Sequence, residues 1–170
     1  MCRQGKAERA LCMQERRNVR QIATELDLAY LAGIIDGEGT IGIYKGAEPF
    51  NYHLALIITN TYAPMLDWVR ARTGGSLTRH TPETARHKQG WQVVVWQARA
   101  ADVIRLCQPY LIVKAQQADL ALRFMSDYVS FRGRNSPVTE EQVAKRRWYY
   151  EQSLAINGGK RTGRPKKKRA

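Results

Sequence analysis

The chain has few cysteines and no long apolar run. Only three cysteines, Cys2, Cys12 and Cys107, occur in 170 residues, and none has the spacing of a zinc site or of a redox pair. No apolar run approaches the roughly 20 residues that a membrane span needs, and the first residues are too charged for a secretory signal. We therefore expect a soluble protein of a reducing intracellular compartment, such as the cytoplasm of a bacterium, an archaeon or a phage-infected cell, or an organelle.

Acidic residues are also scarce. The chain has 15 Asp and Glu against 28 Lys and Arg, which gives a formal net charge of +13 and a pI of about 10.1. Such an excess favours a polyanionic partner such as nucleic acid, although ribosomal and membrane-surface proteins share it. Residues 1–20 carry a net charge of +4 and residues 160–170 carry +7, which leaves +2 for residues 21–159. Because residues 21–159 are nearly neutral overall, this segment can attract DNA only if its Lys and Arg residues gather on one face.

The length allows one folded domain with tails. We assign a basic N-terminal arm to residues 1–26, a folded domain to 27–157 and a basic disordered tail to 158–170, which is too charged to fold. Alternating apolar residues predict strands at residues 40–45, 52–59, 76–81 and 91–97. Helical spacing, with Asp27 as the first N-cap and Pro64 opening the second helix, predicts helices at 28–37, 64–74, 100–107, 114–131 and 139–156. The expected fold is α+β, in the order α-β-β-α-β-β-α with one further helix.

The first predicted helix combines two unusual features. Ala29, Gly33 and Gly37 recur every four residues, so one face is almost bare and a second helix could approach it closely. The helix ends in two carboxylates, Asp36 and Glu38, which the negative end of a helix dipole disfavours unless a cation compensates them. Oxygen ligands of this kind suit Mg²⁺. Either feature alone would favour a buried amphipathic helix that ends in an acidic turn.

Together, the two features resemble the LAGLIDADG motif of homing endonucleases at nine consecutive positions, Leu31 to Gly39. The family core is α-β-β-α-β-β-α with an antiparallel DNA-binding sheet, and it would cover about residues 27–131. The resemblance implies a mobile-intron type of enzyme, a metal-dependent endonuclease that hydrolyses phosphodiester bonds at a specific site in double-stranded DNA. Because only one copy of the motif is present, it also implies a homodimer on a pseudo-palindromic site, with Ala29, Gly33 and Gly37 at the interface.

The resemblance also implies an active site. Glu38 and the backbone carbonyl of Gly37 would hold Mg²⁺ or Mn²⁺, while Asp36 belongs to the helix end. Lys114 lies in a segment similar to the one that carries the family's catalytic lysine, and Asn60 is similar to its polar residue near the metals. The alternatives are an exposed lysine at a helix start and a turn residue that caps the next helix.

One feature of the family is missing from the segment after Asn60. A basic residue is expected a few positions further on, and the run Tyr62-Ala63-Pro64-Met65 has none. Either Arg70 or Arg79 takes its place, or the site uses fewer basic groups.

The predicted sheet supplies the candidates for base contacts in the major groove. If Ile41, Ile43 and Leu77 point inward, the other face of their strands is directed at DNA. The second and fourth strands are apolar on both sides, so the sequence does not select a face for them. The candidate DNA-binding residues are Thr40, Gly42, Tyr44, His53, Ser76, Thr78, His80, Gln92 and Gln97.

Two basic segments are expected to contact phosphates. Arg86 and Lys88 lie in a predicted loop, which could equally be an ordinary solvated loop. The tail resembles an AT-hook around Gly163-Arg164-Pro165 but lacks the arginine before Gly163, so we expect non-specific attraction from it.

Three other functions fit parts of the sequence. A LAGLIDADG fold that binds DNA or RNA without cutting, as a transcription regulator or splicing maturase, is the main alternative; the presence of Glu38 and Lys114 argues against it. Residues 19–26 could open a helix-turn-helix, but residues 28–39 are too apolar and glycine-rich for a recognition helix. Gly42-Ile43-Tyr44 suggests a GIY-YIG nuclease, whose partner motif is absent.

Overall fold

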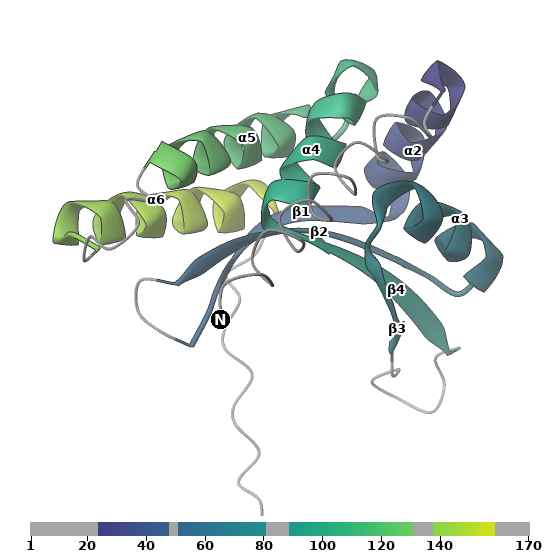
Figure 1. Ribbon diagram of the computed structural model, residues 1–170, viewed down its shortest axis with the longest axis horizontal. Helices are drawn as coiled ribbons and strands as arrows, with labels where there is room; N and C mark the ends of the chain where they lie inside the picture. Colours follow the sequence, from purple (N-terminus) through teal and green to yellow (C-terminus); the bar gives the residue numbers. More distant parts are fainter. Residues whose placement is uncertain (1–23, 48–50, 81–88, 131–137, 159–170) are drawn as a thin grey trace, which may run out of the picture.

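The computed structural model of the chain describes residues 24–47, 51–80, 89–130 and 138–158 (Figure 1). The strands are β1 (Gly39–Lys45), β2 (Tyr52–Asn60), β3 (Ser76–His80) and β4 (Gly90–Trp96). The helices are α2 (Glu25–Glu38), α3 (Ala63–Thr73), α4 (Gln97–Cys107), the short 3-10 helix η1 (Gln108–Tyr110), α5 (Ala115–Ser130) and α6 (Glu140–Ile156). This order confirms the predicted α+β class. Most of the N-terminal arm, the loop with Arg86 and Lys88, and the tail beyond residue 158 lie outside the described residues.

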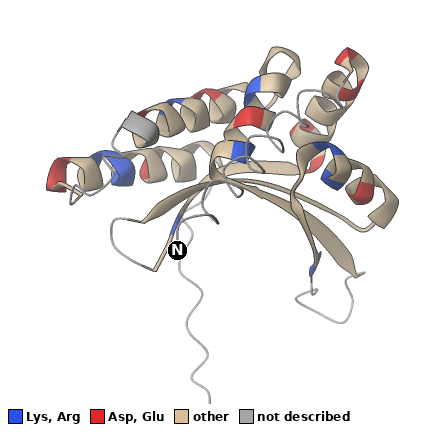
Figure 2. Ribbon diagram, in the orientation of Figure 1, with Lys and Arg blue, Asp and Glu red and all other residues tan. Residues whose placement is uncertain are grey.

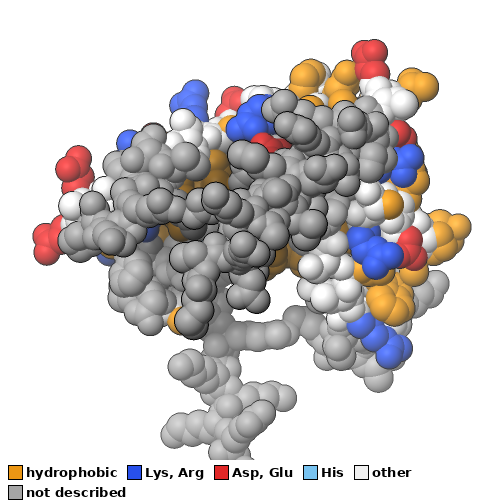
Figure 3. Space-filling model, in the orientation of Figure 1, with side chains coloured by type: hydrophobic (Ala, Val, Ile, Leu, Met, Phe, Trp, Pro, Cys, Tyr) orange, Lys and Arg blue, Asp and Glu red, His pale blue; other side chains and the backbone are white. Residues whose placement is uncertain are grey.

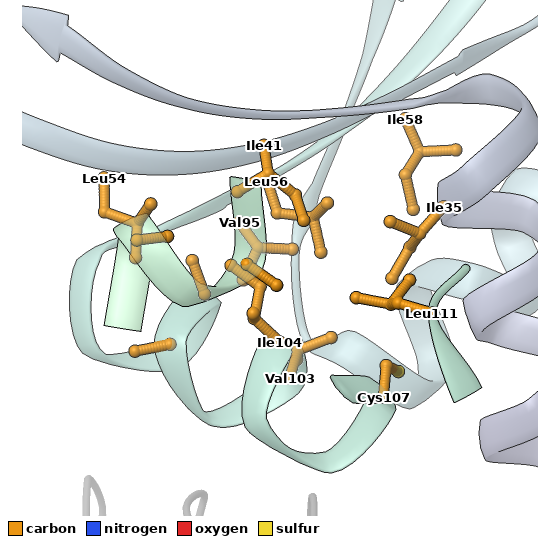
Figure 4. Packing of buried hydrophobic residues seen from close by; sticks show 14 of the residues in the cluster. Ile35, Ile41, Leu54, Leu56, Ile58, Val95, Val103, Ile104, Cys107 and Leu111 are labelled. Atoms are coloured by element: carbon orange, nitrogen blue, oxygen red, sulfur yellow. The ribbon is translucent and has the colours of Figure 1, made fainter. Parts of the chain in front are cut away.

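The four strands form one antiparallel sheet in the order β1-β2-β4-β3, with helices on one of its faces (Figure 1). Inward side chains of the strands, such as Ile41, Leu56 and Val95, pack against Ile35 of α2 and Ile104 of α4 in a continuous apolar core (Figure 4). Within the described ranges, no helix is both long and apolar enough to cross a membrane. In Figure 1, the labelled helices leave the opposite face of the sheet uncovered.

Helix α2 begins earlier than the sequence predicts, and Asp27 is not its N-cap. Thr24 is the cap: its hydroxyl accepts from the Asp27 amide at 3.1 Å, and the Asp27 carboxylate accepts from the Thr24 amide at 3.3 Å. This reciprocal pair is a capping box, in which the acidic residue stands three positions inside the helix. Asp27 also forms a 3.1 Å salt bridge with Arg72 of α3, whose guanidinium lies 3.9 Å from the centre of the Trp68 ring. Asp27 therefore also links the start of α2 to α3.

The junction between β4 and α4 also differs from the prediction. The strand ends at Trp96 and the helix begins at Gln97, whereas the sequence predicts a strand through Gln97 and a helix from Ala100. Gln97 has a φ of 50°, the left-handed region that side chains rarely adopt. Its side-chain oxygen accepts from the Leu54 amide at 3.2 Å. The Gln97 side chain thus takes the place of the backbone carbonyl that would otherwise pair next with β2. Helix α4 can therefore begin directly after β4.

Helix α6 covers the exposed edge of β1. The Ser153 hydroxyl accepts a 3.0 Å hydrogen bond from the buried Ile43 amide, and the Asn157 side chain donates to the Ile41 carbonyl at 3.0 Å. These two bonds satisfy backbone groups that an edge strand would otherwise offer to another chain. The helix is therefore part of the domain, and its observed bounds agree with the prediction.

Replacing Ser153 with alanine tests this edge contact. Ser153→Ala leaves the buried Ile43 amide without an acceptor, so the free energy of unfolding in urea should fall by about 1–3 kcal/mol. Ser76→Ala, the same change at an exposed position of β3, should stay within about 0.5 kcal/mol of the wild type. Equal urea midpoints for the two variants would contradict the assigned role of Ser153.

Candidate functional site

The carboxylate of Asp36 joins the end of α2 to the start of α5. It accepts hydrogen bonds from the backbone amides of Ile112, Val113 and Lys114 at 2.8, 3.1 and 2.9 Å. The Lys114 ammonium in turn donates to the Asp36 backbone carbonyl. A cation thus lies at the negative end of the α2 dipole, where it is favourable. The compensating cation that the sequence predicts for Asp36 is therefore supplied by the protein itself.

The electrostatics of Asp36 follow from the same contacts. Partial burial desolvates its carboxylate and raises the pKa, but the three amide hydrogen bonds and the Lys114 charge outweigh this and hold the pKa below the usual range. The carboxylate is therefore ionised at neutral pH. Both of its oxygens already accept hydrogen bonds from the backbone, which agrees with the prediction that Asp36 belongs to the helix end.

Glu38, by contrast, presents a free carboxylate. It is the last residue of α2 and is exposed, and it makes no hydrogen bond or ion pair with another described residue. Its neighbour Gly37 is exposed as well. A carboxylate and a carbonyl at a helix end, both accessible, provide two oxygen atoms for a cation that comes from outside the chain.

Lys114 and Asn60 come from other elements to the same end of the domain. Lys114 directly precedes α5 and reaches α2 across 78 residues of sequence. Asn60 is the last residue of β2. Two residues before it, Ile58 pairs with Gly39, which directly follows Glu38. The Asn60 side-chain oxygen accepts from the Tyr62 amide at 2.8 Å. This is the turn-forming role that the sequence left open, and it leaves the side-chain NH₂ as the group that could reach a ligand.

The two possible substitutes for the missing basic residue are placed differently. Arg70 lies on α3 and pairs with Asp67 at 3.6 Å, with both side chains exposed. Arg79 pairs in register with Trp91, which pairs with Asn60 on its other side. Its guanidinium is 5.9 Å from the centre of the Trp91 ring. Of the two, Arg79 therefore shares a row of the sheet with Asn60.

Burial determines which strand residues face away from the helices. Ile41 and Ile43 are buried in the core and Leu77 packs against it, as predicted. The structure also selects a face for the two central strands, because Leu54, Leu56, Ile58, Val93 and Val95 belong to the core cluster under the helices, whereas the residues that alternate with them do not. We call the opposite side the open face. Its described residues are Thr40, Gly42, Tyr44, His53, Ala55, Ile57, Thr59, Ser76, Thr78, Gln92, Val94 and Trp96. His80 lies in β3, in register with Gly90.

The open face is uncharged at these positions. Figure 2 shows the strands almost free of blue and red, and Lys45 and Arg79 stand near strand ends. The expectation that Lys and Arg gather on the DNA-facing side is therefore not met by the described strands. Among the described strand residues, the Lys and Arg side chains are thus confined to the ends of strands.

Gln97, a candidate for base contact, is engaged within the protein. With its oxygen bound to the Leu54 amide, its NH₂ group is directed to His53 Nδ1 at 3.0 Å. The His53 ring meets Trp96 edge to face at 6.3 Å, and Tyr44 meets Trp96 in the same way at 6.4 Å. Gln97 therefore supports an aromatic cluster at one end of the open face.

Asp36→Asn tests the link between α2 and α5. Asparagine has a single acceptor oxygen and no charge, so at pH 7 the free energy of unfolding should fall by about 1.5–3 kcal/mol. Because the folded protein lowers the pKa of Asp36, the stabilisation is present above the unfolded pKa, near 4, and is lost as the pH falls through the folded pKa. The difference between variant and wild type in urea should thus be constant above about pH 5 and shrink below pH 4. Asp119→Asn, on the exposed side of α5, is the control; its side-chain oxygen can still accept from the Gln108 NH₂ group, so its stability should stay close to that of the wild type.

Comparison with known proteins identifies the fold. No family model matches the chain, and no curated protein matches it. Among solved structures, the homing endonuclease I-CvuI in complex with the I-CreI target is 17% identical, with 82% of this chain and 87% of that chain covered at a TM-score of 0.64.

Two further structures agree. The archaeal intron-encoded homing endonuclease I-Vdi141I, complexed with DNA, is 14% identical to this chain. The match covers 83% of this chain and 89% of that chain at a TM-score of 0.64. The LAGLIDADG meganuclease I-AabMI, bound to uncleaved DNA, is 17% identical, and 72% of this chain covers 43% of that longer chain at a TM-score of 0.55. The chain therefore has the fold of the LAGLIDADG homing endonucleases.

Proposed function

We propose that the protein is a site-specific DNA endonuclease that hydrolyses phosphodiester bonds in both strands of a duplex as a homodimer. The observation that carries this proposal is the end of α2, where the unpaired Glu38 carboxylate lies two residues from the carbonyl that holds the Lys114 ammonium. An exposed carboxylate at the same helix end as a fixed cation is an arrangement suited to phosphate chemistry. The DNA complexes among the structures of the same fold add support.

Dimerisation is supported by the composition of the exposed side of α2. Ala29, Gly33 and Gly37 are exposed on it, and the apolar side chains of Leu26 and Tyr30 flank them with 83% and 58% of their surface accessible. Figure 3 shows hydrophobic side chains exposed on the side where α2 and α3 lie. A bare stripe with an apolar margin favours a second copy of the same helix, because the two backbones can approach closely.

The loop before α5 extends the same surface. Ile112 and Val113 are 87% and 68% exposed, although their amides are held by Asp36. Two copies joined along α2 would bury these side chains and bring the two Glu38 carboxylates to the dimer axis. One cleavage site for each strand then follows from the two-fold symmetry.

The donor set at Glu38 fits Mg²⁺ or Mn²⁺ as a shared ion. No group of three or more His, Cys, Asp or Glu that could hold a metal occurs among the described residues. Mg²⁺ is commonly held by one or two carboxylates together with substrate phosphates, so Glu38 and the Gly37 carbonyl would suffice with DNA present. Bound there, the ion would activate water and stabilise charge on the phosphate oxygens.

The remaining residues have roles that follow from their positions. The Lys114 ammonium, fixed on the Asp36 carbonyl, would stabilise negative charge at the reacting phosphate. The Asn60 NH₂ group would orient a water or a phosphate oxygen, and Arg79 would add positive charge from the same row of the sheet. The open face would lie in the major groove of a pseudo-palindromic site.

Glu38→Gln tests the proposed chemistry. The change keeps the shape and hydrogen bonding of the helix end but removes the charge that the cation requires. Cleavage of duplexes selected from a random library in Mg²⁺ should fall by orders of magnitude. DNA binding, measured by fluorescence anisotropy, should persist or tighten because a carboxylate no longer repels the phosphates. Glu25→Gln, the same change at the opposite end of α2, is the matched control and should cut normally.

Two results would count against this assignment. A Glu38→Gln variant that cuts at the wild-type rate would exclude Glu38 from the chemistry. A wild-type protein that binds duplexes but leaves them uncut in Mg²⁺ and Mn²⁺ would instead support a non-cleaving DNA-binding protein, such as a transcription regulator or splicing maturase.

Gly33→Leu tests the dimer. A Cβ at Gly33 would meet nothing within 4 Å in the single chain, so the fold should tolerate the larger side chain. In a dimer packed along α2, the leucine would separate the two helices. Light scattering should therefore show a dimeric wild type and a monomeric variant, and circular dichroism should show that the variant is still folded. Ala144→Leu, at an exposed position of α6, should remain dimeric. A monomeric wild type in the presence of DNA would rule out the proposed two-strand mechanism.

A further inference from the structure

An apolar strip crosses the middle of the open face. It consists of Ile57 and Ala55 on β2 and of Val94 and Trp96 on β4, and the register pairs Ile57 with Val94 and Ala55 with Trp96. Trp96 is 49% exposed and Ile57 is partly exposed, whereas Val94 is 8% exposed and Ala55 is buried. Ile57 and Trp96 are thus the members that a partner would touch.

Polar but uncharged residues flank the strip. Ile57 and Val94 stand between Thr40 on β1 and Ser76 on β3 in one row across the sheet. The adjacent row consists of Thr59, Gln92 and Thr78. The whole pattern is an apolar centre with neutral hydrogen-bonding groups on its margins; the described positions of this face carry no carboxylate, in a chain of net charge +13.

This chemistry restricts what the strip can contact in a DNA groove. Phosphates require cations or hydrogen-bond donors, and the strip offers no charge and a single donor, the indole N–H of Trp96. The edges of the bases in the major groove present donors and acceptors, and the apolar group among them is the C5-methyl of thymine. A hydrogen-bonding base edge held against Ile57 and the ring carbons of Trp96 would lose its water without gaining a partner. The thymine methyl is therefore the group that gains from this contact.

We infer that the strip selects thymine by its methyl group, with Ile57 and Trp96 as the contacting side chains; this inference rests on the proposed binding of the open face to duplex DNA. The two side chains are diagonal neighbours on adjacent strands, about 7–8 Å apart. Base pairs follow one another every 3.4 Å or so, so the strip spans about two base-pair steps. Each half-site should therefore contain thymine at one or two neighbouring positions at a fixed distance from the centre.

Replacement of thymine by deoxyuridine tests the inference directly. Deoxyuridine keeps every hydrogen-bonding group of thymine and lacks only the methyl. In a duplex recovered by selection from a random library, each thymine is replaced in turn, and affinity is measured with the wild-type homodimer. At the strip position, affinity should fall about fourfold for each methyl, and about fifteenfold when both half-sites are changed. Thymines elsewhere in the site should tolerate the replacement.

A protein variant connects the effect to the strip. Ile57→Ser removes one of the two apolar side chains that would contact the methyl, so the preference for thymine over deoxyuridine at that position should fall from about fourfold to below about twofold while affinity for the deoxyuridine duplex is retained. Val138→Ser, the same kind of change at an exposed residue before α6, should keep the full preference.

The possible outcomes separate the inference from the function on which it rests. Equal affinity of the wild type for thymine and deoxyuridine at every position, in a duplex that is bound or cut, overturns the inference and leaves the endonuclease proposal intact. Loss of dimerisation in Ile57→Ser without DNA would show that a second copy of the chain covers the strip, and this also overturns it. If no duplex is bound at all, the proposed function fails and the inference fails with it.

Discussion

The carboxylate of Asp36 is the constraint on which the site depends. By accepting three backbone amides from the turn before α5, it fixes a segment that is distant in sequence against the end of α2. The same turn places the Lys114 ammonium on the α2 carbonyl, where the helix dipole favours a cation. Asp36 is thus satisfied by the protein, while Glu38, two residues later, keeps a free and exposed carboxylate. Two acidic residues in one motif therefore have different roles: one holds the structure and the other is available to a ligand.

The neutral surface of the sheet and most of the charged groups lie in different parts of the chain. Its described open face is neutral, with an apolar strip between rows of hydroxyl and amide side chains. A neutral surface would add little long-range attraction to the DNA that we propose as its partner; of the net charge of +13, +4 belongs to residues 1–20 and +7 to residues 160–170. The face itself is suited to distinguishing bases at short range, because donors, acceptors and methyl groups act only in contact.

Much of the fold could be predicted because its signals are local. The order of helices and strands follows from apolar periodicity, and the bounds of α6 follow from Thr139 and the residues after it. The two wrong boundaries have different causes. The start of α2 is set by a local signal, the capping box in which Thr24 is the cap and Asp27 stands three residues later. The end of β4 is set by a distant contact, because Gln97 takes over the Leu54 amide of a neighbouring strand, and this partner cannot be recognised from the residues beside Gln97.

Residue type and helical spacing are sufficient to define the motif, the bare stripe of α2 and the candidates Glu38 and Lys114. The faces of β2 and β4 that lie away from the helices emerge from packing, since both strands are apolar on both sides and alternation gives no preference. Packing also decides that Asp36 is engaged and Glu38 is free, and that Arg79 rather than Arg70 shares a row with Asn60. These distinctions depend on pairing between strands and on a contact across 78 residues, and such long-range choices are made only when the chain packs.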